Sequence, residues 1–145
     1  MTEETTKKIH SILIIEIMGT PKEYLKESLE KILQGITQEK GVKVVESKIN
    51  EAVEVKDKKD FFTSFMEVEV ETIDSFTLAV LMFKYMPAHI EVLYPENLIL
   101  TNHSFNEILN ELVRRLHGYD NLARIFQYEK AKMSEEIEKL REKKK

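Results

Sequence analysis

The sequence predicts an α+β fold of the ferredoxin-like type, a βαββαβ sandwich followed by a long C-terminal helix. The first observation is the order of periodic segments in residues 9–103, which is strand, helix, strand, strand, helix, strand. The second is a 3.5-residue spacing of apolar side chains from Leu109 to Leu140, which is typical of a helix with a narrow apolar edge. Together they predict one domain with a helical extension.

The predicted domain begins with a strand over His10–Met18. This segment is apolar on both faces, which predicts a central position in the sheet. Pro21 follows Thr20, and Glu23 comes three residues after that threonine. This pattern predicts a helix with Thr20 as its N-cap and Glu23 closing a capping box. The glycine at Gly41 marks the turn after the helix.

The sequence predicts a hairpin in the middle of the domain. A strand over Val42–Val55 changes phase between Val44 and Val45, which indicates a bulge, and a strand over Phe61–Ile73 alternates cleanly. The elements that follow are a helix that Asp74 or Ser75 caps and that runs to about Met86, a strand over Ile90–Tyr94 and a short strand over Leu98–Thr101.

The C-terminal helix is predicted over residues 104–143, with Ser104 and Glu107 as a second capping box. Its apolar edge, called the heptad seam below, consists of Leu109, Leu112, Leu116, Tyr119, Ala123, Phe126, Lys130, Met133, Ile137 and Leu140. We therefore expect a disordered segment over residues 1–8, a ferredoxin-like domain over 9–103, and a helix over 104–143. The helix should pack on the domain at its base and form a coiled coil beyond about residue 126. The alternative is a frayed, solvated tail after about residue 128.

Composition excludes several classes of function. There is no cysteine, which excludes disulfides, thiolate zinc sites and a cysteine nucleophile. The net charge of −4 argues against general nucleic-acid binding, and no apolar run is long enough for a membrane span. No nucleophile motif, P-loop or dinucleotide fingerprint is present, so we expect a cytoplasmic, non-enzymatic protein without a cofactor. Enrichment in Lys and Glu is typical of thermophiles.

The most unusual polar feature is a line of side chains on the C-terminal helix, roughly opposite the heptad seam. This polar stripe consists of His103, Asn106, Asn110, Arg114, His117, Asn121 and Arg124. None of its members is a carboxylate, and such groups hold anions well, so the stripe is a candidate binding surface for a partner or an anionic metabolite. Alternatively, it is an ordinary solvated helix face or packs on a sister subunit.

Two weaker candidates involve carboxylates. His103 and Glu107 are four residues apart and so lie on one helix face, but two ligands do not make a metal site, and no metal site is predicted. Glu67, Glu69 and Glu71 should share one face of their strand. This acidic row argues against RNA binding on that face and is more typical of a solvated surface than of acid–base catalysis.

The open face of the sheet is the remaining candidate surface. Ile12, Ile14, Phe61 and Phe65 are expected to point away from the two domain helices and to form an apolar patch. Either the wide base of the C-terminal helix or a second subunit should cover this patch. We expect a homodimer or higher homo-oligomer whose contacts are Ile12, Ile14, Phe61, Phe65, Phe126, Met133, Ile137 and Leu140, with a further protein partner possible through the helix.

These features lead to a non-enzymatic assembly or adaptor protein as the first hypothesis. The alternative is a small-molecule sensing or regulatory domain that binds an anionic metabolite near Asn106, Arg114 and His117 or at a dimer interface. A third and weaker hypothesis is an enzyme of unrecognised type that uses His103, Arg114 and His117.

Overall fold

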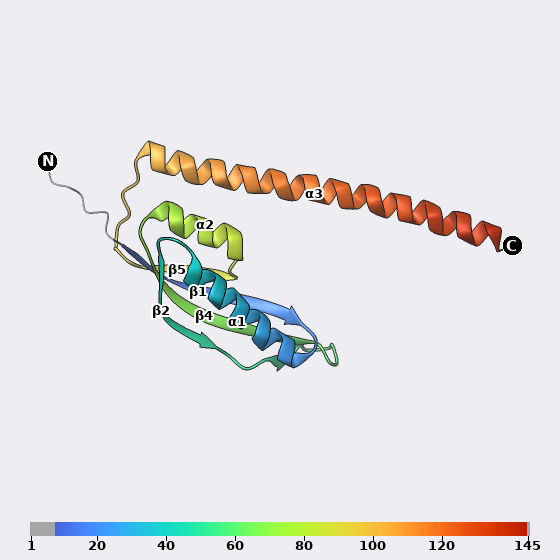
Figure 1. The fold of residues 1–145 in the computed structure, drawn as a ribbon, viewed down its shortest axis with the longest axis horizontal. Coiled ribbons are helices and arrows are strands. Elements are labelled where there is room, and N and C mark those ends of the chain that lie inside the picture. Colours follow the sequence, from blue (N-terminus) through green and yellow to red (C-terminus); the bar gives the residue numbers. More distant parts are fainter. Residues whose placement is uncertain (1–7, 145) are drawn as a thin grey trace. The chain divides into compact units, whose positions relative to one another are not determined.

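An antiparallel sheet with helices on one face forms the N-terminal part of the chain in this computed structural model, which describes residues 8–144. Its elements are β1 (Ile9–Gly19), α1 (Lys22–Gln38), β2 (Val42–Ile49), β3 (Val53–Glu54), β4 (Phe62–Thr72), α2 (Ser75–Tyr85), β5 (His89–Tyr94) and α3 (Asn102–Lys143) (Figure 1). The expected disordered segment lies, except for Lys8, outside the described residues. The chain divides into two compact units, with the boundary between Ile108 and Leu109.

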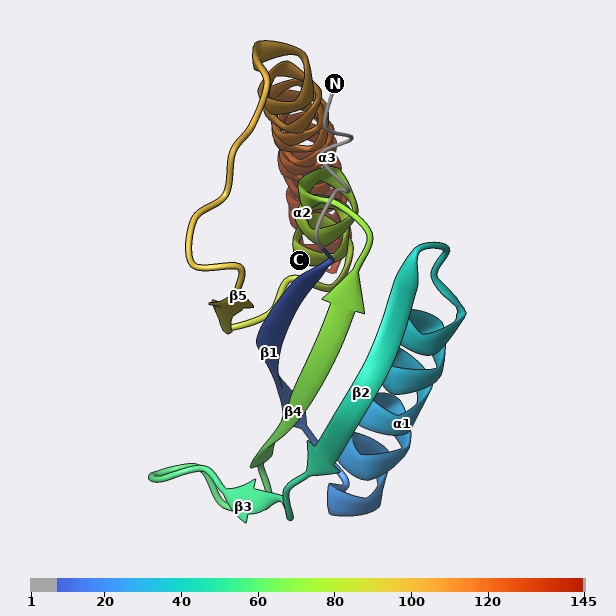
Figure 2. The same cartoon turned by 90° about the vertical axis from the view of Figure 1, so that its left-hand side faces the viewer.

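The order of strands in the sheet is β2-β4-β1-β5, and the short β3 pairs with β4. All pairings are antiparallel, and β1 lies between β4 and β5 as its two apolar faces predicted (Figure 2). This order is consistent with the ferredoxin-like fold, in which each helix connects two strands that have a third strand between them. The α+β class and the long C-terminal helix are therefore confirmed.

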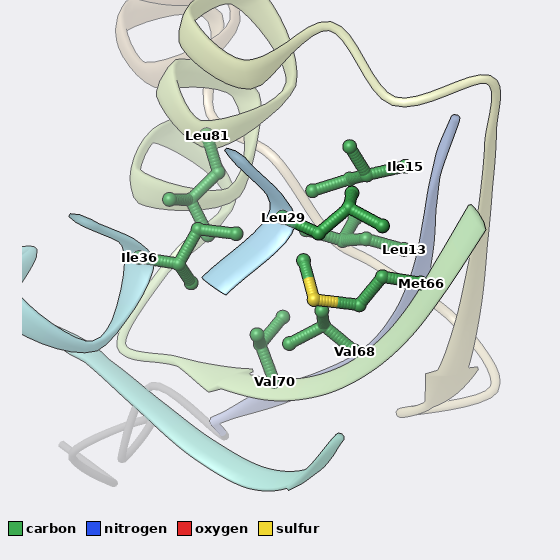
Figure 3. Packing of buried hydrophobic residues seen from close by; sticks show 8 residues of the cluster. All are labelled: Leu13, Ile15, Leu29, Ile36, Met66, Val68, Val70 and Leu81. Carbon is green, nitrogen blue, oxygen red and sulfur yellow. The ribbon is translucent and has the colours of Figure 1, made fainter. Parts of the chain in front are cut away.

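The core lies between the sheet and the two helices that follow β1 and β4. Alternate residues of β1 and β4 face this layer because side chains change face at every step along a strand. Figure 3 shows the buried side chains that meet there: Leu13, Ile15, Leu29, Ile36, Met66, Val68, Val70 and Leu81. Leu29 and Ile36 come from α1 and Leu81 from α2, so both helices cover the same face of the sheet.

Two local predictions in the domain are confirmed. The register between β2 and β4 shifts between Val44 and Glu46, which places the predicted bulge at Val45. At the start of α2, the backbone N–H of Thr77 donates a hydrogen bond of 2.7 Å to Asp74 Oδ1, so Asp74 is the N-cap. Such a cap satisfies one of the backbone donors that a helix leaves free at its start.

Both predicted capping boxes are wrong. Pro21 rather than Thr20 occupies the N-cap position of α1, and no side chain caps that helix, because Thr20 lies one residue too early. At α3 the cap is Thr101, whose Oγ1 accepts a hydrogen bond of 3.1 Å from the backbone N–H of Ser104. Ser104 is therefore inside the first turn, and α3 begins two residues earlier than predicted.

Two predicted strands also differ from the structure. The strand over Val42–Val55 is interrupted at residues 50–52, where the backbone N–H of Asn50 donates to Phe65 O at 3.0 Å and Ser64 Oγ donates to Asn50 O at 2.8 Å. The segment Leu98–Thr101 is not a strand. The ladder of β5 on β1 ends where Tyr94 pairs with His10, and β1 begins at Ile9, so only one residue of β1 remains beyond that pair.

Candidate functional site

The candidate site lies on α3, a single helix of 42 residues. At 1.5 Å per residue it is about 60 Å long. The helix is continuous through Gly118. A Cβ added at this residue would meet no heavy atom within 4 Å, apart from the nearby backbone of the helix itself. Glycine therefore lowers helix propensity here without ending the helix. In the described part of the chain, no helix is sufficiently long and apolar to cross a bilayer.

The heptad seam is exposed along the part of α3 that follows residue 108. None of the residues of α3 is buried. Five large apolar side chains of the seam expose half or more of their surface: Leu116 (56%), Phe126 (58%), Met133 (61%), Ile137 (51%) and Leu140 (62%). We call these five the exposed seam residues. A row of such side chains along one helix face is the pattern that a partner helix covers in a coiled coil.

Sequence reasoning missed two apolar residues beside the heptad seam. Leu122 and Ile125 are also exposed, with 46% and 52% of their surface accessible. Because successive residues on a helix are 100° apart, Leu122 directly flanks the seam, whereas Ile125 lies farther round. The apolar edge is thus wider near Phe126 than near Leu140. A search for apolar residues at all helical spacings, rather than at heptad spacings alone, would have found both.

Three side chains of the polar stripe lie beside carboxylates of neighbouring helix residues, although the stripe itself contains no carboxylate. Arg114 Nε lies 3.2 Å from Glu111 Oε2, and Arg124 Nε lies 3.1 Å from Asp120 Oδ2. His103 Nε2 is 3.4 Å from Glu107 Oε1. The carboxylates lie three or four residues from their partners, a spacing that brings side chains together on a helix.

The strongest of these pairs involves Glu111. Its Oε1 also accepts a hydrogen bond of 2.8 Å from Arg115 Nε, so one carboxylate serves two guanidinium groups. The hydrogen bonds from Arg114 and then from Arg115 hold the pKa of Glu111 below its ordinary value. The positive charge expected on the stripe is therefore partly neutralised within the helix. Asn106, Asn110, His117 and Asn121 lie on the same exposed helix, and their role as a binding surface stays a prediction.

On the open face of the sheet, the four predicted apolar residues are interleaved with charged ones. Ile12 is opposite Glu69 on one side and Glu91 on the other, while Ile14 is opposite Glu67 and His89. Both isoleucines are half-buried within the single chain.

The two phenylalanines of that face differ in exposure. Phe65 is 43% exposed opposite Glu16, and Phe61 is half-buried with Lys58 Nζ at 5.5 Å from its ring centre. Since carboxylates separate the apolar side chains, the face is less apolar than the sequence indicated. Its role in oligomerisation stays a prediction.

The acidic row on β4 is partly balanced by lysines that the sequence reasoning did not place. Lys48 is opposite Glu67 and Lys43 is opposite Glu71 across the β2–β4 ladder. Lys8 Nζ lies 3.1 Å from Glu71 Oε1, and this contact lowers the pKa of that carboxyl. In residues 8–144 no three histidine or acidic side chains come close enough to hold a metal ion.

A polar cluster joins the end of α1 to the end of α2. Tyr85 OH donates a hydrogen bond of 2.7 Å to Glu39 Oε1, and Lys84 Nζ contacts the same oxygen. Burial, and then the hydrogen bond to Glu39, raise the pKa of Tyr85 to about 12. A Cβ at Gly35 would lie 2.9 Å from the tyrosine hydroxyl oxygen, so glycine leaves room for this contact. The cluster therefore links the end of α1 to the end of α2 through side-chain contacts.

Glu39 should make the stability of the domain sensitive to acid. The hydrogen bonds from Lys84 and then Tyr85 lower its pKa below the ordinary value of 4.5. A carboxyl whose pKa is lowered by folding stabilises the protein above its unfolded pKa, and this contribution is lost as the pH falls through the folded pKa. We expect Glu39→Gln to lower the free energy of unfolding by about 1 kcal/mol at pH 7, with a much smaller effect near pH 3.5.

Urea unfolding at the two pH values measures this difference at one protein concentration. Glu27→Gln, at an exposed position of α1, is the matched control and should change stability little at either pH. Equal losses for Glu39→Gln at pH 7 and pH 3.5 would contradict the assignment of the ion pair.

One cavity of about 500 Å³ lies between the start of α1 and the interruption after β2. Its polar lining includes Lys22, Glu23, Lys26, Asn50, Glu51 and Ser64. The lining contains two lysines and two glutamates, and the Ser64 hydroxyl already donates to Asn50 O. The lining therefore offers no net charge and no free buried donor with which to select an anion.

The fold and the exposed seam residues define a small α+β protein that carries a long amphipathic helix with a heptad repeat. The chain belongs to the MJ0538 family, whose model matches residues 10–145. No curated protein matches the sequence. The match covers the α+β domain from the second residue of β1 onward and the whole of α3.

Proposed function

We propose that the chain is a homo-oligomeric assembly or adaptor module, which joins its α+β domain to that of a second copy through the heptad seam of α3. The observation that carries this proposal is the row of exposed seam residues at alternating spacings of three and four. An isolated helix with such a narrow apolar edge is marginal in water, and a second helix with the same edge stabilises it.

The apolar surface available on the seam supports association of moderate strength. Fully burying one such side chain contributes about 1.5–3 kcal/mol, and each of the five is already about half covered. Ten side chains in a pair of helices therefore contribute roughly 10 kcal/mol. The loss of translational and rotational freedom on association is estimated at about 4–15 kcal/mol, which is the same order. We expect an equilibrium between species that depends on protein concentration.

Removal of the last part of α3 tests the proposal. Sedimentation equilibrium of the full chain should give twice the mass of one chain at concentrations of tens of micromolar. A chain that ends after Tyr128 lacks Met133, Ile137 and Leu140, and it should sediment with the mass of one chain. Two monomeric species would reject the proposal. Two dimeric species would instead place the interface outside the last part of α3.

The metabolite-sensing alternative receives less support from the geometry. It depends on free positive charge at the polar stripe, whereas Arg114 and Arg124 are paired with carboxylates of their own helix. A thermal-shift screen with nucleotides, amino acids and inorganic phosphate separates the two functions. A ligand that binds only the folded state raises the melting temperature, and a rise that Arg114→Gln abolishes would favour sensing.

A further inference from the structure

We infer that two copies of α3 pair in parallel and in register, so that Glu136 of each copy lies against Arg141 of the other. This inference rests on the proposed function and adds the orientation of the partner. In heptad notation, Leu109 and every seventh residue after it occupy a, and Leu112 and every seventh residue after it occupy d. The residues that flank the seam on its two sides are then the g and e positions, whose charges select partner and orientation.

The flanking charges are complementary in the parallel arrangement. There, each g residue faces the e residue that is five positions later in the second copy. This geometry pairs Arg115 with Asp120 of the second copy and Glu136 with Arg141 of the second copy. The other two facing pairs each contain an uncharged residue: Leu122 with Gln127, and Glu129 with Ser134. No like charges meet at these positions.

The same charges oppose an antiparallel pair. When two helices overlap from Leu116 to Leu140 in opposite directions, g residues face g residues. Arg115 then faces Lys143 of the second copy, and Glu129 faces Glu129 of the second copy. Both contacts join like charges, which repel at this distance. A parallel pair therefore gains two contacts between opposite charges, whereas an antiparallel pair has two kinds of contact between like charges.

Lys130 is the charged residue at an a position of the seam. A parallel pair can accommodate it, although the two lysine side chains repel each other. Two copies of Lys130 lie side by side across a parallel seam and repel each other. Glu129 of the second copy occupies the neighbouring g position, within reach of the lysine side chain, and offsets this repulsion. A single polar a residue is a known means of fixing the register and the number of strands in a coiled coil.

Near the C-terminal end of α3, the charged side chains that would pair with the second copy are not engaged in ion pairs within their own helix. Arg115 and Asp120 are engaged with Glu111 and Arg124 of their own helix, at 2.8 Å and 3.1 Å. Glu136 and Arg141, by contrast, have no ion-pair partner among the described residues. Their pairing across two copies therefore breaks no existing contact. The Glu136–Arg141 pair is accordingly the stronger determinant of orientation.

Distances between spin labels on single introduced cysteines test the orientation, since the natural chain has no cysteine. Tyr128 and Glu142 both lie on the outer side of the helix. In either orientation two labels at Tyr128→Cys lie about 20 Å apart, the combined width of two helices. Two labels at Glu142→Cys lie about 20 Å apart only in the parallel pair, because an antiparallel pair separates them by about 40 Å along the axis.

The two labels separate failure of the inference from failure of the proposed function. A short distance at both positions is the expected result. A short distance at residue 128 with about 40 Å at residue 142 overturns the parallel arrangement and leaves self-association intact. No short distance at either position removes the proposed function and with it this inference.

A charge exchange provides a second test with a different readout. Glu136→Arg and Arg141→Glu should each weaken self-association by about threefold to tenfold, because each creates two like-charge contacts per parallel pair. An equimolar mixture of the two variants should associate more tightly than either alone, since every facing pair in the mixed dimer is then of opposite charge. An antiparallel seam places these residues opposite Leu122 and Val113, so equal association of the mixture and of each variant alone would overturn the inference.

Discussion

Replacing Ile137 with aspartate should raise the dissociation constant of the full-length dimer about 100-fold. Ile137 occupies a seam position and exposes 51% of its surface in the single chain, so a partner helix is needed to cover it. The substitution removes two isoleucines from the interface and places two carboxylates opposite each other in an apolar setting. Loss of apolar burial and desolvation of charge together amount to about 3 kcal/mol, which corresponds to roughly that factor.

Sedimentation equilibrium measures this change, with Tyr128→Asp as the matched control. Tyr128 is on the same helix and is similarly exposed, at 64%, but it lies on the side away from the heptad seam. Both variants exchange an apolar residue for aspartate within a helix, so both carry a comparable loss of helix propensity. Equal weakening by the two variants would show that helix stability, rather than contact at the seam, accounts for the effect.

The fold was predictable because its elements carry clear apolar periods. The bounds of strands that are apolar on both faces or alternate strictly are predicted within about two residues, and Asp74 is one of the two cap candidates that precede the apolar helix. The heptad seam predicted one helix through Gly118, since the spacing does not change phase there. These signals are local: each depends on residues that are close together in the sequence.

The errors arose where several residues compete for one structural role. Thr101 and Ser104 are both good N-caps, and the sequence contains a capping-box pattern at the second, yet the first forms the cap. For Leu98–Thr101, strand propensity is high but no neighbouring strand is available, and a strand requires a ladder partner. The tertiary structure determines which cap forms and which segment pairs as a strand, and the local sequence does not show either outcome.

For the candidate site too, the sequence predicts features that depend on nearby residues and misses those that depend on tertiary packing. The exposed seam residues follow directly from their spacing. The pairing of the polar stripe was also available in the sequence, because Glu111 lies three and four residues before Arg114 and Arg115. The contact between Glu39 and Tyr85 was not available, since 46 residues separate them and only the packing of α1 and α2 brings them together.

The largest effect on stability is expected for Leu29→Ala. Leu29 is fully buried on α1 and packs in the cluster that includes Leu13 and Met66 of the sheet (Figure 3). Its truncation removes apolar contacts and leaves a cavity that the surrounding strands fill only in part, which destabilises a protein by about 2–5 kcal/mol. Because a domain of this size is stable by only about 5–15 kcal/mol, the melting temperature should fall by about 10–20 °C.

Differential scanning calorimetry of the full chain at one fixed concentration measures this loss, since association also raises the apparent stability. Leu33→Ala is the matched control: it is the same chemical change on the same helix at a half-buried position that only borders the cluster. It should lower the melting temperature by about half as much. If the two variants melted at the same temperature, Leu29 would not be packed more deeply in the core than Leu33, contrary to the structure.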